Sequence, residues 1–204
     1  PVRLSAQLYA TDARLSDLVE LLTAIRSHYL GIFGEALDAL RAEKRTFIVE
    51  PALLDAQGEV VREGLLDTGA RCDVLVVVGE ALTPTTLSAD RMLQFEPASF
   101  TGANLTVVIS PFTWDNARIA IDCEAQAAAK VLADWFEEAF SERGGADNQS
   151  LLGVAHEISD PLVEGATSIA LIDFGSVDIA LVIDLFDRLG AAGASRVELS
   201  LPEV

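Results

Sequence analysis

One short segment, Asp73 to Val78, constrains the fold of this chain more than any other. After the aspartate it reads Val-Leu-Val-Val-Val, so an extended strand here is apolar on both faces and does not alternate. Such a strand is typical of the centre of a sheet that is covered on both sides. A second apolar run, Leu105 to Ile109, has the same character. The chain is therefore expected to pack other elements against both faces of a central sheet.

The spacing of apolar residues elsewhere predicts both helices and strands. Residues 15–44 show helical spacing interrupted by Gly31 and Gly34, which predicts two helices or one kinked helix. Residues 80–103 are expected to form a long irregular connection. Further helices are expected at 124–142 and 177–189. Further strands are expected at 3–9, 46–50, 118–122, 168–174 and 196–201, with 105–109 and 118–122 paired as a hairpin.

These patterns predict a mixed α/β fold of the α+β kind, in which a central mixed β-sheet carries packed helices. The last fifty residues are expected to form a C-terminal β-α-β unit. Polar residues 146–150 favour a boundary between a main α/β domain, 1–145, and a C-terminal β-α-β subdomain, 151–204. A single domain that contains both ranges remains the alternative.

The first residues lack the features of a secretory signal, and no apolar run reaches the ~18 residues of a membrane helix. A cytoplasmic location is therefore expected. The two cysteines, Cys72 and Cys123, do not form a disulfide framework. They are interpreted as small buried side chains, with a disulfide or a reactive thiol as the alternatives.

The charge balance bears on the partners of the protein. The chain carries 32 acidic and 14 basic residues, a net charge of −18. A field of this sign repels the phosphates of nucleic acids and the headgroups of anionic membranes. Neither is expected as a partner, whereas a basic protein partner is compatible with the charge, as is solubility alone.

Four polar residues are the candidates for catalysis: Asp115, Asp122, His156 and Glu157. A histidine beside carboxylates can act as a general base, and carboxylates at strand ends can share acid and base roles or bind a hard cation. Asp122 could instead cap the helix at 124–142, and His156 with Glu157 could be an exposed polar turn. The two histidines of the chain, His28 and His156, do not have zinc-ligand spacing. No metal site and no cofactor are therefore predicted.

The triplet Asp173-Phe174-Gly175 matches the metal-binding triplet of protein kinases. The glycine-rich loop, the strand lysine and the His-Arg-Asp segment that kinases also need are not present. The triplet is therefore interpreted as the end of a strand and a turn.

Two apolar features are candidates for binding. Phe112 and Trp114 lie two residues apart in a predicted turn, where they could anchor a partner or fold back over the edge of the core. The helix predicted at 177–189 is apolar on nearly all sides, so it belongs to the core or forms a homodimer interface.

No catalytic signature stands out, so catalysis is not the first expectation. The sequence favours a non-catalytic acidic protein-interaction module, such as an adaptor, a chaperone or an immunity-type protein. A small-molecule hydrolase with a carboxylate and histidine site is the alternative, and a ligand-sensing domain is the second.

Overall fold

The computed structural model describes residues 15–79, 81–87, 92–102, 104–141 and 150–202. It confirms the predicted mixed α+β fold, with helices packed against a mixed sheet. Its helices are α1 (Leu15–Ala42), α2 (Ala125–Phe140) and α3 (Ile179–Ala191). None of the described helices is both long and apolar enough to cross a membrane. The strand predicted at 3–9 lies outside the described residues.

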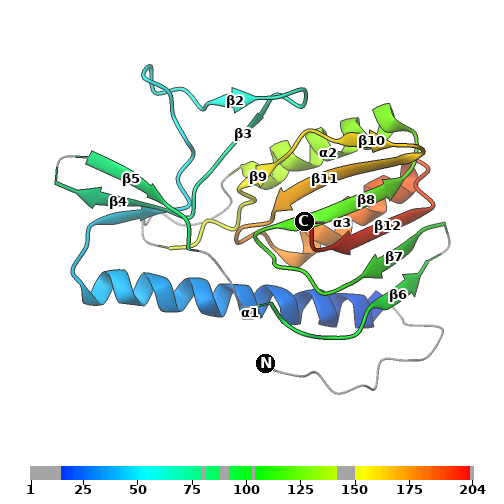
Figure 1. Ribbon diagram of the computed structural model, residues 1–204, viewed down its shortest axis with the longest axis horizontal. Helices are drawn as coiled ribbons and strands as arrows, with labels where there is room; N and C mark the ends of the chain where they lie inside the picture. The colour runs from blue at the N-terminus through cyan, green and yellow to red at the C-terminus, as the bar shows by residue number, and fades with distance from the viewer. Residues whose placement is uncertain (1–14, 80, 88–91, 103, 142–149, 203–204) are drawn as a thin grey trace.

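A seven-stranded sheet forms the larger part of the molecule, and its strands follow the order β10-β11-β8-β12-β7-β6, with β9 beside β11. Only the β12–β7 pair is parallel. Helices α2 and α3 lie behind this sheet in Figure 1 and cover one of its faces. The strands are β6 (Ala98–Thr101), β7 (Thr106–Ile109), β8 (Ala117–Asp122), β9 (Glu157–Ile158), β10 (Leu162–Glu164), β11 (Thr167–Asp173) and β12 (Arg196–Ser200).

A smaller antiparallel sheet, in the order β1-β4-β5, lies beside the larger one. It is made of β1 (Phe47–Val49), β4 (Val74–Val78) and β5 (Ala81–Thr85). A separate hairpin pairs β2 (Arg62–Glu63) with β3 (Thr68–Gly69). In Figure 1 the single long helix α1 runs below both sheets.

The structure corrects several predictions about the strands. The runs 105–109 and 118–122 do not form a hairpin, because β12 lies between β7 and β8 and pairs with both. The connection 80–103 is not irregular throughout, since it contains β5 and β6. Strand β4 is central, but only in the small sheet, and Val78 is 53% exposed. Long-range pairing decides all three outcomes, and local pattern does not specify it.

The helices follow their predictions more closely. Residues 15–42 form one unbroken helix that continues through Gly31 and Gly34. The N-cap of α3 is Asp178, whose side chain accepts a hydrogen bond from the Ala180 N–H. Strands β11 and β12 flank β8 in the large sheet, so residues 151–204 share that sheet with residues 98–122.

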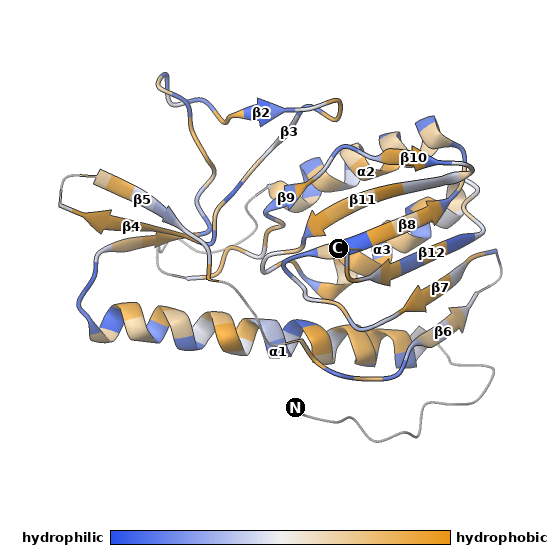
Figure 2. Cartoon of the chain, viewed as in Figure 1, coloured by the Kyte–Doolittle hydropathy of each residue, from blue (hydrophilic) through white to orange (hydrophobic). Residues whose placement is uncertain are grey.

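The core explains the apolar helix at 177–189. Its large side chains pack within their own chain, and the indole N–H of Trp135 on α2 donates to the Leu181 carbonyl at 2.8 Å. In Figure 2 the strands of the large sheet in front of this helix also carry hydrophobic residues. Of the two alternatives, the core accounts for the helix, and nothing supports a dimer through it. Its buried residues are Ile179, Leu181, Val182, Leu185, Phe186 and Leu189.

Candidate functional site

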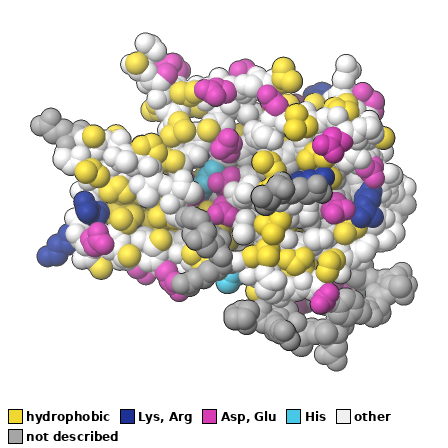
Figure 3. Space-filling model, in the orientation of Figure 1, with side chains coloured by type: hydrophobic (Ala, Val, Ile, Leu, Met, Phe, Trp, Pro, Cys, Tyr) yellow, Lys and Arg dark blue, Asp and Glu magenta, His cyan; other side chains and the backbone are white. Residues whose placement is uncertain are grey.

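Three carboxylates from two sheets converge on one buried histidine. Glu50 directly follows β1 and Asp73 directly precedes β4, and the Glu50 N–H donates to the Asp73 carbonyl at 2.8 Å. His156 directly precedes β9 and Asp173 ends β11, and the His156 N–H donates to the Asp173 carbonyl at 2.9 Å. Each sheet thus contributes two residues whose backbones are hydrogen-bonded to each other. We call these four residues the His156 cluster. Figure 3 shows histidine and acidic side chains together near the middle of one face.

The imidazole of His156 contacts a carboxylate at each ring nitrogen. Its Nε2 lies 2.9 Å from Glu50 Oε1. Its Nδ1 lies 3.1 Å from Asp73 Oδ1 and 3.3 Å from Asp173 Oδ2. The side chains of Glu50, Asp73 and His156 are at most 4% exposed, whereas that of Asp173 is 24% exposed. Asp173 is therefore the member of the cluster that solvent reaches.

Glu50 is held in an uncommon backbone conformation. Its φ of 51° lies in the left-handed region, which costs a residue with a side chain about 1 kcal/mol or more. Its carboxylate accepts hydrogen bonds from the Leu152 N–H at 2.5 Å and from both the N–H and the hydroxyl of Ser176, at 3.1 and 2.8 Å. These contacts compensate the strain and fix the carboxylate against His156.

Gly175 makes room for the histidine ring. Its φ is +50°, and a Cβ at this position would lie 2.4 Å from the Val154 carbonyl oxygen and 2.5 Å from His156 Cδ2. Only glycine fits both the conformation and the space. The predicted turn after Asp173 therefore exists, and it also forms one wall of the site.

The cluster sets the protonation of the histidine. Burial lowers the pKa of His156, but the carboxylates of Asp173, Asp73 and Glu50 outweigh burial and raise that pKa well above 6.5. Burial raises the pKa of Asp173, and His156 partly opposes this. The raised pKa of His156 therefore favours an imidazolium that contacts all three carboxylates.

We expect the stability of the protein to fall as the pH rises above about 6.5. The unfolded chain loses the histidine proton near this pH, whereas the folded chain keeps it until the raised folded pKa is reached. The free energy of unfolding should decrease by up to about 1.4 kcal/mol per pH unit in this window. Urea unfolding in the presence of a chelator, at several pH values, measures the slope. His156→Gln should lack it, and an equal slope in both proteins would contradict this assignment.

Tyr29 of α1 adds a hydroxyl near the cluster. Its side chain is 3% exposed, and its hydroxyl has no hydrogen-bond partner among the described residues. Burial raises the pKa of Tyr29 well above 10, as do the carboxylates of Asp173, Asp73, Asp115 and Glu50. These charges act on the phenol because it lies near them. Tyr29 also lines a small pocket with aromatic walls that include Phe112 and Trp114.

The structure brings only one of the four predicted catalytic residues into the cluster, namely His156. Glu157 is exposed on β9, so its side chain lies on the other face of the strand from His156. Asp122 lies at the end of β8, where its carboxylate accepts a hydrogen bond from the Thr167 hydroxyl at 2.7 Å. Asp122 does not cap α2 either, because Glu124 does so. Asp115 contributes to the raised pKa of Tyr29 through its charge.

Phe112 and Trp114 are core residues. Each is 1% exposed, their rings stack at 6.3 Å, and the Trp114 indole N–H donates to the Gly175 carbonyl at 3.0 Å. The second of the two predicted alternatives, packing over the core, therefore describes them, and neither offers an exposed surface to a partner. Trp114 instead supports the turn that faces His156.

The cysteines Cys72 and Cys123 are both free and half-buried.

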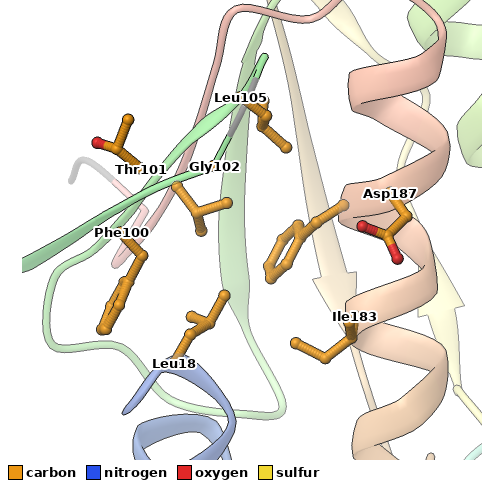
Figure 4. Close-up of a pocket in the computed structure, with 9 residues that line it drawn as sticks. Leu18, Phe100, Thr101, Gly102, Leu105, Ile183 and Asp187 are labelled. Atoms are coloured by element: carbon orange, nitrogen blue, oxygen red, sulfur yellow. The ribbon is translucent and has the colours of Figure 1, made fainter. Parts of the chain in front are cut away.

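A separate apolar pocket lies away from this cluster (Figure 4). It is formed between the start of α1, strands β6 and β7, and α3, and Asp187 is the one titratable residue in its lining. It has no group of convergent polar side chains, so the His156 cluster remains the better candidate for chemistry. The lining residues drawn in Figure 4 include Leu18, Phe100, Thr101, Leu105, Ile183 and Asp187.

Sequence reasoning missed Glu50, Asp73, Ser176 and Tyr29, and it interpreted Asp173 only as a strand end. One signal was available: Glu50, Asp73 and Asp173 are acidic residues directly at the ends of apolar strands. No family model, curated protein or solved structure matches the chain. The geometry of the site is therefore the basis for a functional proposal.

Proposed function

We propose that this protein is a hydrolytic enzyme for a small molecule and that the His156 cluster is its active site. The observation that carries the proposal is the convergence of three carboxylates on one buried histidine, with one carboxylate open to solvent. Buried charges, shifted pKa values and backbone strain concentrate at functional sites, because folding alone rarely favours them. All three features occur in this cluster.

Asp173 is the residue that touches the substrate in this proposal. Its carboxylate, which is 24% exposed, takes a proton from the attacking water as the water oxygen bonds to the substrate. It returns that proton to the leaving group as the bond to the leaving group breaks, so the proton balance closes on one residue. His156 is a positioning residue, since its side chain is 1% exposed and acts through Asp173. Glu50 in turn orients the imidazole through Nε2.

A panel of chromogenic esters, amides and phosphate esters tests the proposal. Asp173→Asn removes the base at nearly constant volume and should lower kcat/KM at least 100-fold for the substrate that is turned over. Asp134→Asn is the matched control, because Asp134 is exposed on α2 and pairs with Lys130 one helical turn away. The absence of turnover across the panel, or equal turnover by wild type and Asp173→Asn, would refute the proposal.

A protein-interaction module remains the second candidate, and one observation favours it. Leu162 and Val163 are 69% and 58% exposed on β10, an outer strand of the large sheet. Exposed apolar side chains on an outer strand suit a protein partner, and the negative net charge favours a basic one. Titration with a basic peptide, followed by chemical shift changes at β10, tests this role. Unchanged shifts at β10 would exclude it for this strand.

A further inference from the structure

We propose that Asp73, His156 and Asp173 together bind a divalent transition-metal ion of the Zn²⁺ or Mn²⁺ class. This inference rests on the proposed active site and names its cofactor. When bound, such an ion would supply the activation of water by lowering the pKa of a water on it, and Asp173 would then serve as a ligand and not as the base. The sequence predicted neither a metal site nor a cofactor, because the three ligands are distant in sequence and show no ligand spacing. In the folded chain one ligand atom from each residue lies within 4.8 Å of the other two.

The distances between the ligand atoms fit a shared cation. A transition-metal ion about 2.1 Å from each ligand, with angles of about 90° to 109° between them, holds two ligand atoms about 3.0 to 3.4 Å apart. The observed separations from His156 Nδ1 are 3.1 Å to Asp73 Oδ1 and 3.3 Å to Asp173 Oδ2. Both values lie in this range, and the two carboxylate oxygens lie within 4.8 Å of each other.

The direction of the ring nitrogen supports the same conclusion. Although both oxygens are close, His156 Nδ1 is a buried polar atom that makes no hydrogen bond of acceptable geometry with the described residues. A hydrogen bond needs the acceptor oxygen nearly in line with the N–H bond. A cation bound to Nδ1 would instead lie on that line with both oxygens off it, and two close oxygens that form no such hydrogen bond are compatible with this arrangement.

Each ligand is also held from behind by a second contact. Glu50 Oε1 contacts the far ring nitrogen, Nε2, and so leaves Nδ1 for the cation. Asp73 Oδ2 accepts the Leu87 N–H at 2.6 Å, and Asp173 Oδ1 accepts the Gly175 N–H at 2.8 Å. In both aspartates the other oxygen faces Nδ1. Outer contacts of this kind orient metal ligands and maintain their affinity.

The chemistry of the ligand atoms indicates which cation fits the site. One imidazole nitrogen with two carboxylate oxygens suits Zn²⁺ or Mn²⁺ better than Mg²⁺ or Ca²⁺, which prefer oxygen ligands alone. Three protein ligands leave a position for water, as catalytic sites require.

The test is cation binding by the full chain, measured without any substrate. Chelator-treated protein is titrated with Zn²⁺ by calorimetry and with Mn²⁺ by electron paramagnetic resonance, and Co²⁺ is added to record its visible absorption. We expect one equivalent to bind and Zn²⁺ to bind more tightly than Mn²⁺. A Co²⁺ spectrum that shows no ligand-field bands, or no binding of Zn²⁺ and Mn²⁺ at millimolar concentration, would overturn the inference.

Variants locate the bound ion. Asp73→Asn and Asp173→Asn should each weaken Zn²⁺ binding at least 10-fold, and Glu50→Gln should weaken it 10- to 100-fold through the histidine. His28→Gln is the matched control, since it removes the other histidine of the chain, which lies on α1. Circular dichroism checks that each variant folds. If a variant does not fold, the Co²⁺ spectrum of the wild type still tests the inference. Equal affinity in wild type and the aspartate variants would place the ion elsewhere and refute the assignment.

The outcomes separate this inference from the proposed function. Cation binding that depends on Asp73 and Asp173, without turnover of any substrate, retains the metal site and removes the enzyme. Turnover that depends on Asp173 and persists in excess chelator, without cation binding, retains the enzyme and removes the metal site.

Discussion

Replacing His156 with glutamine should lower the free energy of unfolding by about 3 to 5 kcal/mol, the usual cost of removing one partner from a buried charge group. The substitution leaves the carboxylates of Glu50, Asp73 and Asp173 without their shared cation in a site from which water is largely excluded. Glutamine keeps a polar side chain of moderate size, so the loss reports the missing charge more than a cavity. Urea unfolding of the chelator-treated protein near neutral pH measures the difference.

The control for this experiment is His28→Gln. His28 lies on α1, is partly exposed and does not belong to the cluster, so its substitution should change stability much less than His156→Gln does. The loss in His156→Gln should also shrink in acid, where protonation removes the charges of the carboxylates. A loss below about 1 kcal/mol at neutral pH would show that the carboxylates do not depend on the imidazolium.

Gly175→Ala should destabilise the protein by about 2 to 4 kcal/mol, through two separate effects. Alanine at a φ of +50° costs about 1 kcal/mol in the backbone. The added methyl group would also overlap the Val154 carbonyl and the His156 ring, and overpacking of this kind costs about 1 to 3 kcal/mol. Thermal unfolding measures the sum, and the chemical shifts of the His156 ring report its displacement.

Gly165→Ala separates the two effects. Gly165 has a φ of +65°, but a Cβ there would meet nothing within 4 Å. Its substitution should therefore carry the backbone cost alone, about 1 kcal/mol. If both variants lose the same stability, the close approach of Gly175 to the histidine contributes nothing, and the packing of the ring is looser than its contacts indicate.

The elements of this fold that depend on local pattern could be predicted from the sequence. Helices α2 and α3 and strands β11 and β12 lie close to their expected positions, because apolar periodicity and end signals are local properties. The pairing could not be predicted. The insertion of β12 between β7 and β8 joins segments far apart in the chain, and nothing in either segment specifies that partner.

The site follows the same division. His156 was a candidate because a histidine beside acidic residues is visible in one segment, yet its true partners are not its sequence neighbours. Glu50 lies 106 positions away, and the neighbouring Glu157 points to the other face of β9. Asp173 was visible as a strand end, but its role depends on the antiparallel pairing of β9 with β11. Tertiary pairing therefore created the site from residues that local pattern treats as separate.

The division of the His156 cluster between the two sheets has a consequence for how the protein can be cut or redesigned. The ladder of the large sheet does not include Glu50 or Asp73, so a fragment without residues 47–85 could retain every strand pair of that sheet and still lack half of the charged group. Of the three carboxylates that contact His156, only Asp173 would then remain. Retention of the large sheet in such a fragment would therefore say nothing about retention of its chemistry.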